Sequence, residues 1–237
     1  MKLSAVCFDA TGTLIEIAES VGEVYHRVAL EYGVDLPAWR LEDAFRRILR
    51  RAPARGIAGD SVDERRDGEI KWWFERIRET FQATDSTARF QDFQAFADAL
   101  FETYRAPGAW QLRPGTLEML TELRSRGLRM VVVSNFDHRL LKILELLDIS
   151  SFFDTVIIPS KIGRAKPDRA VFEAVAESLS LPLNALDSLL YVGDDPKETL
   201  RAIEEFGLQV IDIHQIEDLE TLPERLVKAA ILPPRPD

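Results

Sequence analysis

The sequence has little of what marks a secreted or membrane protein. Cys7 is its single cysteine, so no disulfide can form within the chain. No apolar run approaches the length needed to cross a bilayer, and the stretch before Asp9 is too short for the apolar part of a signal peptide. These absences predict a protein of the reducing cytoplasm with no membrane segment.

Positive charge is also scarce. Lysine and arginine number 30 against 40 aspartate and glutamate residues, which gives a net charge of −10. A protein this acidic gains no affinity for DNA or RNA from counterion release, so nucleic acid is not expected as a partner. An anionic substrate would need a local positive site. The one basic run, over residues 46–51, is interpreted as a solvated helix face.

Short apolar runs recur along the chain, and they predict the strands of a sheet. The runs lie at residues 3–8, 128–134, 154–158, 188–192 and 208–212. Runs that are apolar on both faces suit a parallel sheet covered on both sides. Helical patterns, several of which begin with proline, separate the later runs. The predicted fold is α/β, with a Rossmann-like, doubly wound parallel sheet.

The stretch between the first two runs breaks this alternation. From Leu14 to about Arg113 there is no convincing strand, only helical patterns at residues 20–32, 41–51, 62–81 and 90–104. Nearly a hundred helical residues are too many for one crossover between strands. We therefore predict a core of residues 1–15 and 113–237 with an inserted all-helical unit of residues 16–112.

Polar side chains follow three of the predicted strands, where ligands bind in open α/β sheets. Asp9, Ser134 and Asp194 each stand at a strand's carboxyl end, so these distant segments should converge on one crevice. Taken singly, Asp9 fits a cap or turn residue at least as well. Ser134 and Asn135 could bind a phosphoryl oxygen, or could cap the helix that begins near Asp137.

Two further segments suggest how an anion and a cation would be held. Lys166 directly precedes a predicted helix, where its ammonium could meet both a carboxylate and a phosphate; exposed lysines are usually only solvated, and Lys161 is a nearby competitor. Asp194, Asp195 and Glu198 cluster after a buried strand. Oxygen ligands of this kind suit Mg²⁺, although Gly-Asp-Asp-Pro is also a good turn sequence.

Four segments, in this order, resemble the four motifs of the haloacid dehalogenase-like hydrolases. They are Asp9-Ala-Thr-Gly-Thr-Leu14, Val132-Val-Ser-Asn135, Gly163-Arg-Ala-Lys-Pro-Asp168, and Val192-Gly-Asp-Asp195 followed by Glu198. The helical insert after the first motif looks like the helical C1-type cap of subfamily IA of this superfamily. The resemblance implies a Mg²⁺-dependent phosphatase acting on a small phosphorylated substrate, with cap residues 16–112 controlling access.

The resemblance also implies a nucleophile and a metal site. Asp9 would attack phosphorus and form an aspartyl-phosphate, which divides the hydrolysis into two easier steps. Asp9, the backbone carbonyl of Thr11 and Asp194 would hold magnesium, with Asp195 or Glu198 as a further acid.

The remaining roles concern the phosphoryl group. Ser134 and Asn135 would bind it, and Lys166 would offset negative charge in the transition state. Thr13 would support the loop of the first motif. The substrate itself and the oligomeric state stay open at this stage.

Thr11 departs from the family pattern, because family phosphatases usually carry a second aspartate there as general acid and base. A threonine hydroxyl cannot protonate a leaving alkoxide near neutral pH, so the expected enzyme is slow or prefers activated phosphates. P-type ATPases of the same superfamily also have threonine at this place. Two alternatives remain: a phosphate-binding or regulatory protein with little turnover, and a metal-independent 2-haloacid dehalogenase. The acidic cluster argues against the second.

Overall fold

The computed structural model describes residues 3–53 and 59–232. The chain divides into two compact units, one of residues Met1–Glu16 and Leu112–Asp237 and one of residues Ile17–Gln111. We call the first the core unit and the second the helical unit, and each is described by itself.

The core unit is built on a parallel sheet of five strands. These are β1 (Ala5–Phe8), β4 (Arg129–Val133), β5 (Thr155–Ile157), β6 (Leu189–Gly193) and β7 (Gln209–Asp212), in the order β5-β4-β1-β6-β7. Every neighbouring pair is parallel. Four of these strands fall within predicted runs, and β6 extends one residue beyond the run at residues 188–192. The strand order reverses beside β1, as in a Rossmann-like sheet. The predicted fold class is therefore confirmed.

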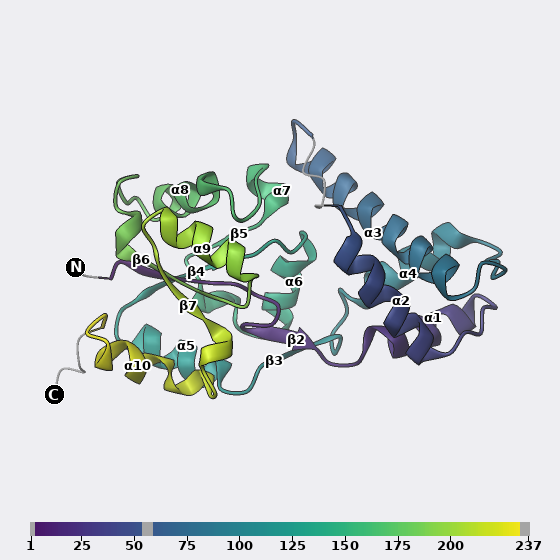
Figure 1. Ribbon diagram of the computed structural model, residues 1–237, viewed down its shortest axis with the longest axis horizontal. Coiled ribbons are helices and arrows are strands. Elements are labelled where there is room, and N and C mark those ends of the chain that lie inside the picture. Colours follow the sequence, from purple (N-terminus) through teal and green to yellow (C-terminus); the bar gives the residue numbers. More distant parts are fainter. Residues whose placement is uncertain (1–2, 54–58, 233–237) are drawn as a thin grey trace. The chain divides into compact units, whose positions relative to one another are not determined.

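Helices cover both faces of this sheet. They are α5 (Thr116–Ser125), α6 (Arg139–Leu146), α7 (Pro159–Ile162), α8 (Arg169–Ser178), α9 (Lys197–Glu205) and α10 (Leu222–Lys228). Short 3-10 turns lie at Ser150–Phe152, Leu186–Ser188, Ile213–Gln215 and Leu219–Thr221. Right-handed crossovers place α5 and α6 on one face, and α8 and α9 on the other, because the chain moves across the sheet in opposite directions after β1 and after β5 (Figure 1).

Side-chain alternation decides which strand residues meet α8 and α9. On this face Cys7 of β1, Val133 of β4 and Tyr191 of β6 pack in one apolar cluster with Phe172 of α8 and Ile203 of α9. All five are buried. Full burial of an aliphatic or aromatic side chain contributes roughly 1.5–3 kcal/mol, so this cluster anchors the strand ends that carry the polar residues.

The helical unit contains α1 (Val21–Glu31), α2 (Ala38–Arg51), α3 (Val62–Thr84) and α4 (Phe93–Thr103). Its core is rich in aromatic rings, with Tyr25 stacked on Phe81 and Phe81 edge-on to Phe96. Ser61 and Glu64 form a capping box that starts α3. Among the described residues, no helix combines the length and apolar character needed to cross a membrane.

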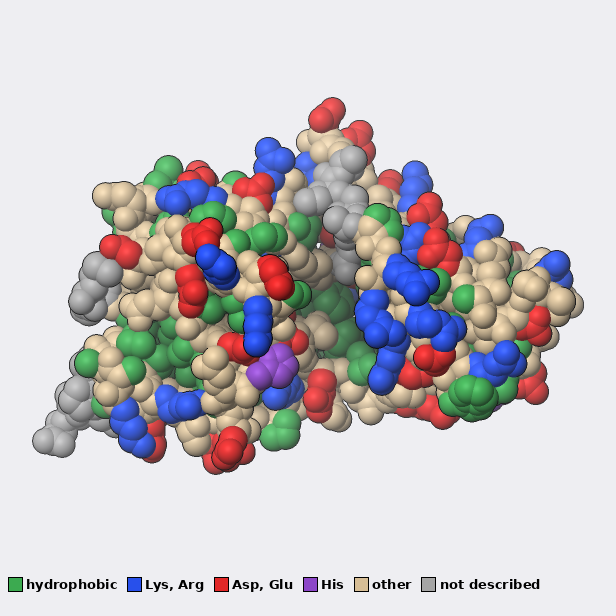
Figure 2. All heavy atoms as spheres, viewed as in Figure 1, with side chains coloured by type: hydrophobic (Ala, Val, Ile, Leu, Met, Phe, Trp, Pro, Cys, Tyr) green, Lys and Arg blue, Asp and Glu red, His purple; other side chains and the backbone are tan. Residues whose placement is uncertain are grey.

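The basic run lies on α2. Arg46, Arg47, Arg50 and Arg51 are exposed, and Figure 2 shows a group of Lys and Arg side chains over this helix. Arg46 pairs with Glu42 one turn earlier, at 2.7 Å, and Arg47 pairs with Asp43 in the same way. These pairs fit the predicted solvated helix face, because exposed i,i+4 pairs are ordinary surface features.

Two short strands were not predicted. β2 (Ile15–Ile17) and β3 (Trp110–Leu112) form a separate two-stranded sheet at the two places where the chain passes from one unit to the other. The expectation of no strand between Leu14 and Arg113 is therefore wrong. Each has three residues with a polar one in the middle, so neither forms an apolar run like those that predicted the core strands.

Candidate active site

Asp9 directly follows β1, and its backbone is fixed to the neighbouring strand. Its N–H donates to the carbonyl of Val192 at the end of β6, at 2.9 Å. After Asp9 the chain turns tightly, because the carbonyl of Ala10 accepts the N–H groups of Thr13, Leu14 and Ile15 at 2.8–3.2 Å. Asp9 thus stands at the carboxyl edge of the sheet, between β4 and β6, as the sequence predicted for a ligand site.

Lys166 reaches Asp9 from the segment before α8. Its Nζ lies 2.7 Å from Oδ1 of Asp9 and 3.0 Å from Oδ2 of Asp195, and it also donates to the hydroxyl of Tyr191. Only 1% of the Lys166 side chain and 10% of the Asp9 side chain are exposed. Lys161, the competing lysine, instead donates to the carbonyl of Val156. Of the two candidate lysines, Lys166 is the one that is buried beside Asp9.

The charges of this cluster set its titration. Burial raises the pKa of Asp9, and the charge of Asp195 adds to this, while Lys166 and a hydrogen bond from Ser134 lower it. Burial would lower the pKa of Lys166, but the carboxylates of Asp9 and Asp195 outweigh it and raise that pKa, so the ammonium stays charged. Burial also raises the pKa of Tyr191, which keeps its phenol protonated.

Ser134 and Asn135 follow β4 and serve different neighbours. The Ser134 side chain hydrogen-bonds Asp9, and its Oγ accepts the N–H of Phe136 at 3.3 Å. The Asn135 side chain is used on the backbone of Lys166: its Nδ2 donates to the Lys166 carbonyl at 3.0 Å, and its Oδ1 accepts the Lys166 N–H at 2.8 Å. Asn135 therefore ties the second motif to the third.

Asp194 lies against the loop of the first motif. A Cβ built on Gly12 would lie 2.0 Å from Oδ2 of Asp194, and Gly12 has a φ of +83°. Burial raises the pKa of Asp194 to about 6, and the negative charges of Asp9 and Asp195 act in the same direction. Two carboxylates, Asp9 and Asp194, thus repel each other where the first loop meets the end of β6.

This arrangement suits a hard divalent cation. Across residues 3–53 and 59–232, no three side chains of His, Cys, Asp or Glu are grouped as a metal site. Mg²⁺, however, commonly takes one or two carboxylates and completes its shell with carbonyl and water oxygens. Asp9, Asp194 and the carbonyl of Thr11 would provide such a set, and a cation between the two carboxylates would relieve their repulsion.

The other predicted acids and hydroxyls differ in their surroundings. Oδ2 of Asp195 is occupied by Lys166 and Tyr191, so Asp195 supports the lysine. Glu198 is exposed in the first turn of α9.

The hydroxyls of Thr11 and Thr13 are buried, and within the described part of the chain they have no hydrogen-bond partner. Both hydroxyls belong to the loop that follows Asp9 and could donate to a bound oxyanion.

Sequence reasoning missed Tyr191, whose hydroxyl belongs to this cluster, and Arg113, which donates to the carbonyl of Gly12. A tyrosine inside an apolar run reads as an ordinary strand former. The signal that could have found it is the spacing. Tyr191 and Gly193 are two residues apart, so they lie on the same face of β6, directly before Asp194 and Asp195.

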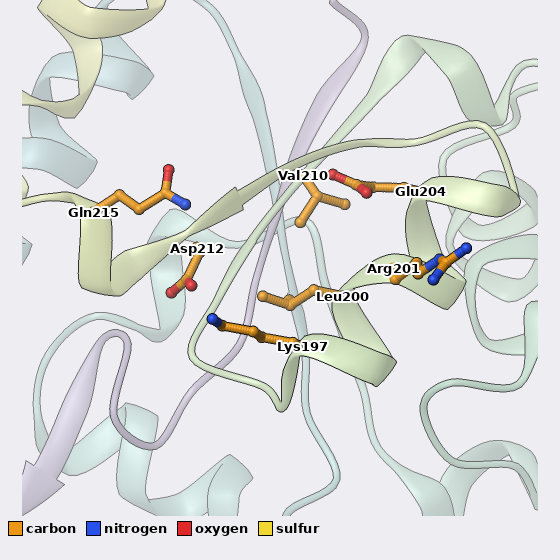
Figure 3. A pocket seen from close by; sticks show the side chains of 7 residues that line it. All are labelled: Lys197, Leu200, Arg201, Glu204, Val210, Asp212 and Gln215. Carbon is orange, nitrogen blue, oxygen red and sulfur yellow. The ribbon is translucent and has the colours of Figure 1, made fainter.

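A separate hollow of about 300 Å³ lies between α9 and β7, and none of the residues predicted for the site lines it. Figure 3 shows the amino group of Lys197 turned toward the carboxylate of Asp212, with Arg201 and Glu204 at the other end. Its two cations and two carboxylates balance, so the hollow offers no net positive charge to a phosphorylated ligand.

Comparison with known proteins gives a consistent result. Residues 3–207 match the family model described as haloacid dehalogenase-like hydrolase. The haloacid dehalogenase-like hydrolase domain-containing protein 3 of Homo sapiens is 30% identical over 202 residues, which is 82% of this chain and 75% of that protein. The phosphorylated carbohydrates phosphatase of Thermotoga maritima is 24% identical over 234 residues, covering 98% of this chain and 95% of its own.

Among solved structures, the HAD-hydrolase YfnB from Bacillus subtilis bound to magnesium has a TM-score of 0.69 at 15% identity, covering 97% of this chain and 99% of that one. At this identity the likeness concerns the fold alone.

Proposed function

Because the chain belongs to the family of haloacid dehalogenase-like hydrolases, we propose that it is a magnesium-dependent phosphatase that acts on a small phosphorylated compound through Asp9. The observation that carries this proposal is the contact of Lys166 Nζ with Oδ1 of Asp9, at 2.7 Å, beside a second carboxylate, Asp194. A buried carboxylate held in this way is oriented as a nucleophile.

The contact with Lys166 supports different roles for the two oxygens of Asp9. Oδ1 is bound by the ammonium, so in this proposal Oδ2 attacks phosphorus. The new bond joins Oδ2 to phosphorus while the bond from phosphorus to the leaving oxygen breaks, and the leaving oxygen takes a proton from solvent. Water then attacks the aspartyl-phosphate, which releases inorganic phosphate and restores the carboxylate of Asp9.

The chain's own groups would hold the phosphoryl oxygens during both steps. Ser134 already hydrogen-bonds Asp9, and the hydroxyls of Thr11 and Thr13 are donors in the adjacent loop. Magnesium held by Asp9, the Thr11 carbonyl and Asp194 would supply positive charge to the anionic phosphoryl group. Asp195 would keep Lys166 in place. Glu198, which is exposed, would not be one of the magnesium ligands and would contribute only from outside them.

Thr11 determines the class of substrate in this proposal. Its hydroxyl does not titrate near neutral pH, so no acid at this position protonates the leaving oxygen. General acid assistance is worth about 10²–10⁴-fold, and a leaving group of low pKa needs it least. We therefore propose a preference for acyl or aryl phosphates over alkyl phosphates.

The same residue favours a second candidate, a phosphate-binding or regulatory protein with little turnover. Such a protein would bind the phosphoryl group at Asp9 and Lys166 but release it slowly. A haloacid dehalogenase is disfavoured by Asp194, because a metal-independent site would hold no cation to offset the repulsion between this carboxylate and Asp9.

The test is hydrolysis of a panel of phosphorylated compounds with Mg²⁺, which should include acetyl phosphate, p-nitrophenyl phosphate and alkyl phosphates. Asp9→Asn and EDTA should each abolish activity, while Asp187→Asn, at an exposed carboxylate of the core unit, should not change it. Activity that survives Asp9→Asn would refute the proposal. Binding of beryllofluoride to the wild type without turnover would favour the regulatory candidate.

A further inference from the structure

Tyr191 is a strand residue whose hydroxyl lies among charged groups. It stands in β6 and is 0% exposed. The hydroxyl accepts a hydrogen bond from Lys166 Nζ and donates one to Oδ2 of Asp195. Phe172 of α8 lies 5.8 Å from the Tyr191 ring, measured between centroids, at an angle of 89°, so the ring is held edge-on by the core.

The hydrogen bonds of Lys166 account for all of its donors. An ammonium has three N–H groups, and those of Lys166 are directed at Asp9 Oδ1, Asp195 Oδ2 and the Tyr191 hydroxyl. Only the first partner is the nucleophile. The other two bind each other as well as the lysine, so Lys166, Tyr191 and Asp195 form a closed ring of hydrogen bonds that fixes the ammonium from two sides.

Gly193 leaves space in the backbone for this ring of hydrogen bonds. A Cβ on Gly193 would lie 2.8 Å from Cε1 of Tyr191, and 2.9 Å from both the Tyr191 hydroxyl and Oδ2 of Asp195. No Cβ fits at such distances. Gly193 therefore allows the tyrosine and the aspartate to approach each other and the lysine.

We propose that Tyr191 is a positioning residue: its hydroxyl holds Asp195 and Lys166 so that the ammonium binds Oδ1 of Asp9 and leaves Oδ2 directed at phosphorus. The proposal rests on the function proposed above. It also explains why a tyrosine, rather than a phenylalanine, occupies this place in a buried strand, since a buried hydroxyl without partners would be costly.

The first test is Tyr191→Phe, which keeps the ring and removes the hydroxyl. With p-nitrophenyl phosphate and Mg²⁺, kcat should fall about ten- to hundredfold, the range expected for a lost hydrogen bond to a charged group, with KM nearly unchanged. Tyr32→Phe, in the helical unit, is the matched control and should change neither constant. A rise in KM alone would overturn the proposal.

A double-mutant test separates positioning from general destabilisation. If Tyr191 acts through the lysine, Tyr191→Phe should lower kcat in the wild type but cause little further loss in a Lys166→Met background. Equal losses in both backgrounds would indicate an effect on the whole fold and would overturn the proposal. Gly193→Ala provides a second variant, which keeps the hydroxyl but displaces it, and should reproduce the loss of kcat.

A crystal structure of Tyr191→Phe gives a readout that does not depend on activity. Lys166 Nζ should leave Oδ1 of Asp9 in the variant, and retention of that contact near 2.7 Å would refute the positioning role. If the wild type hydrolyses no phosphorylated compound, the proposed function fails, and the displacement of Lys166 still decides the role of Tyr191.

Discussion

The carboxylate of Asp194 lies so close to the backbone of Gly12 that any side chain at that glycine would displace it, with a Cβ only 2.0 Å from Oδ2. The loop that carries Asp9 and the end of β6 are thus joined at a contact that only glycine permits. The pairing of β1 with β6 brings the two candidate metal ligands, Asp9 and Asp194, to the same edge of the sheet, and Gly12 leaves the space that the Asp194 carboxylate occupies there.

We expect Gly12→Ala to weaken magnesium binding by at least about tenfold, because the new methyl group pushes Asp194 away from Asp9, and the left-handed φ of +83° adds roughly 1 kcal/mol of strain. Calorimetric titration with Mg²⁺ measures the first effect, and urea unfolding measures the second. Gly127→Ala is the matched control, since Gly127 has a φ of +70° and no atom within 4 Å of the added Cβ. Equal magnesium affinity in the two variants would contradict the role of the contact.

Thr11→Asp should raise turnover of an alkyl phosphate, because the new carboxyl group can protonate the leaving oxygen. The gain should lie within the roughly 10²–10⁴-fold range of general acid catalysis and should be much smaller for acetyl phosphate. Steady-state kcat on the two substrates measures this difference. Thr11→Asn, which has a similar shape but no titratable group, should give no gain; a gain as large as that of aspartate would speak against acid catalysis.

Asn135→Ala removes both hydrogen bonds between the second motif and the backbone of Lys166. We expect a loss of about 1–3 kcal/mol in the free energy of unfolding, together with a lower kcat, because Lys166 loses its alignment with Asp9. Urea unfolding and steady-state kinetics measure the two effects. Asn184→Ala, at an exposed residue of the core unit, is the control. A selective rise in KM would instead show that Asn135 binds the phosphoryl group directly.

The Cys7 thiol should be unreactive in the folded protein. Burial raises the pKa of Cys7 to about 12, and the thiolate is the reactive form. At pH 8 the thiolate fraction is therefore lower than that of a free cysteine by about a thousandfold or more, so a disulfide reagent should label the native protein far more slowly than the protein in urea. Rapid labelling without unfolding would show that β1 opens locally. Cys7→Ala gives the baseline.

Much of the core unit could be predicted from its sequence because its strands are buried on both faces. The middles of the apolar runs, such as residues 130–133 and 189–192, are apolar throughout, and proline and glycine mark the ends of helices between them. β2 and β3 carried no such signal, since each is three residues long with a polar residue, Glu16 or Gln111, in the middle. The distinction between Lys166 and Lys161 also needed the fold, because the two lysines are only five residues apart in the sequence and their tertiary contacts separate them.

The site residues show a similar division. Asp9, Ser134 and Asp194 were accessible to prediction because strand ends meet at one edge of a parallel sheet. The contacts of Asp195 with Lys166 and Tyr191 could not be predicted, because a sequence shows that a residue is acidic but not which way its side chain points. The hydrogen bonds that Oδ2 of Asp195 accepts from Lys166 and Tyr191 show that Asp195 turns toward the lysine.

The order of the strands has a consequence for biosynthesis. Ala5 of β1 pairs with Arg129 of β4 on one side and with Leu189 of β6 on the other, although the ribosome makes β1 first. The helical unit can complete its local contacts early, whereas β1 has no partner until most of the polypeptide has emerged. A nascent chain that stops before β6 would lack the edge on which Asp9 and Asp194 meet, so catalytic competence is acquired only late in translation.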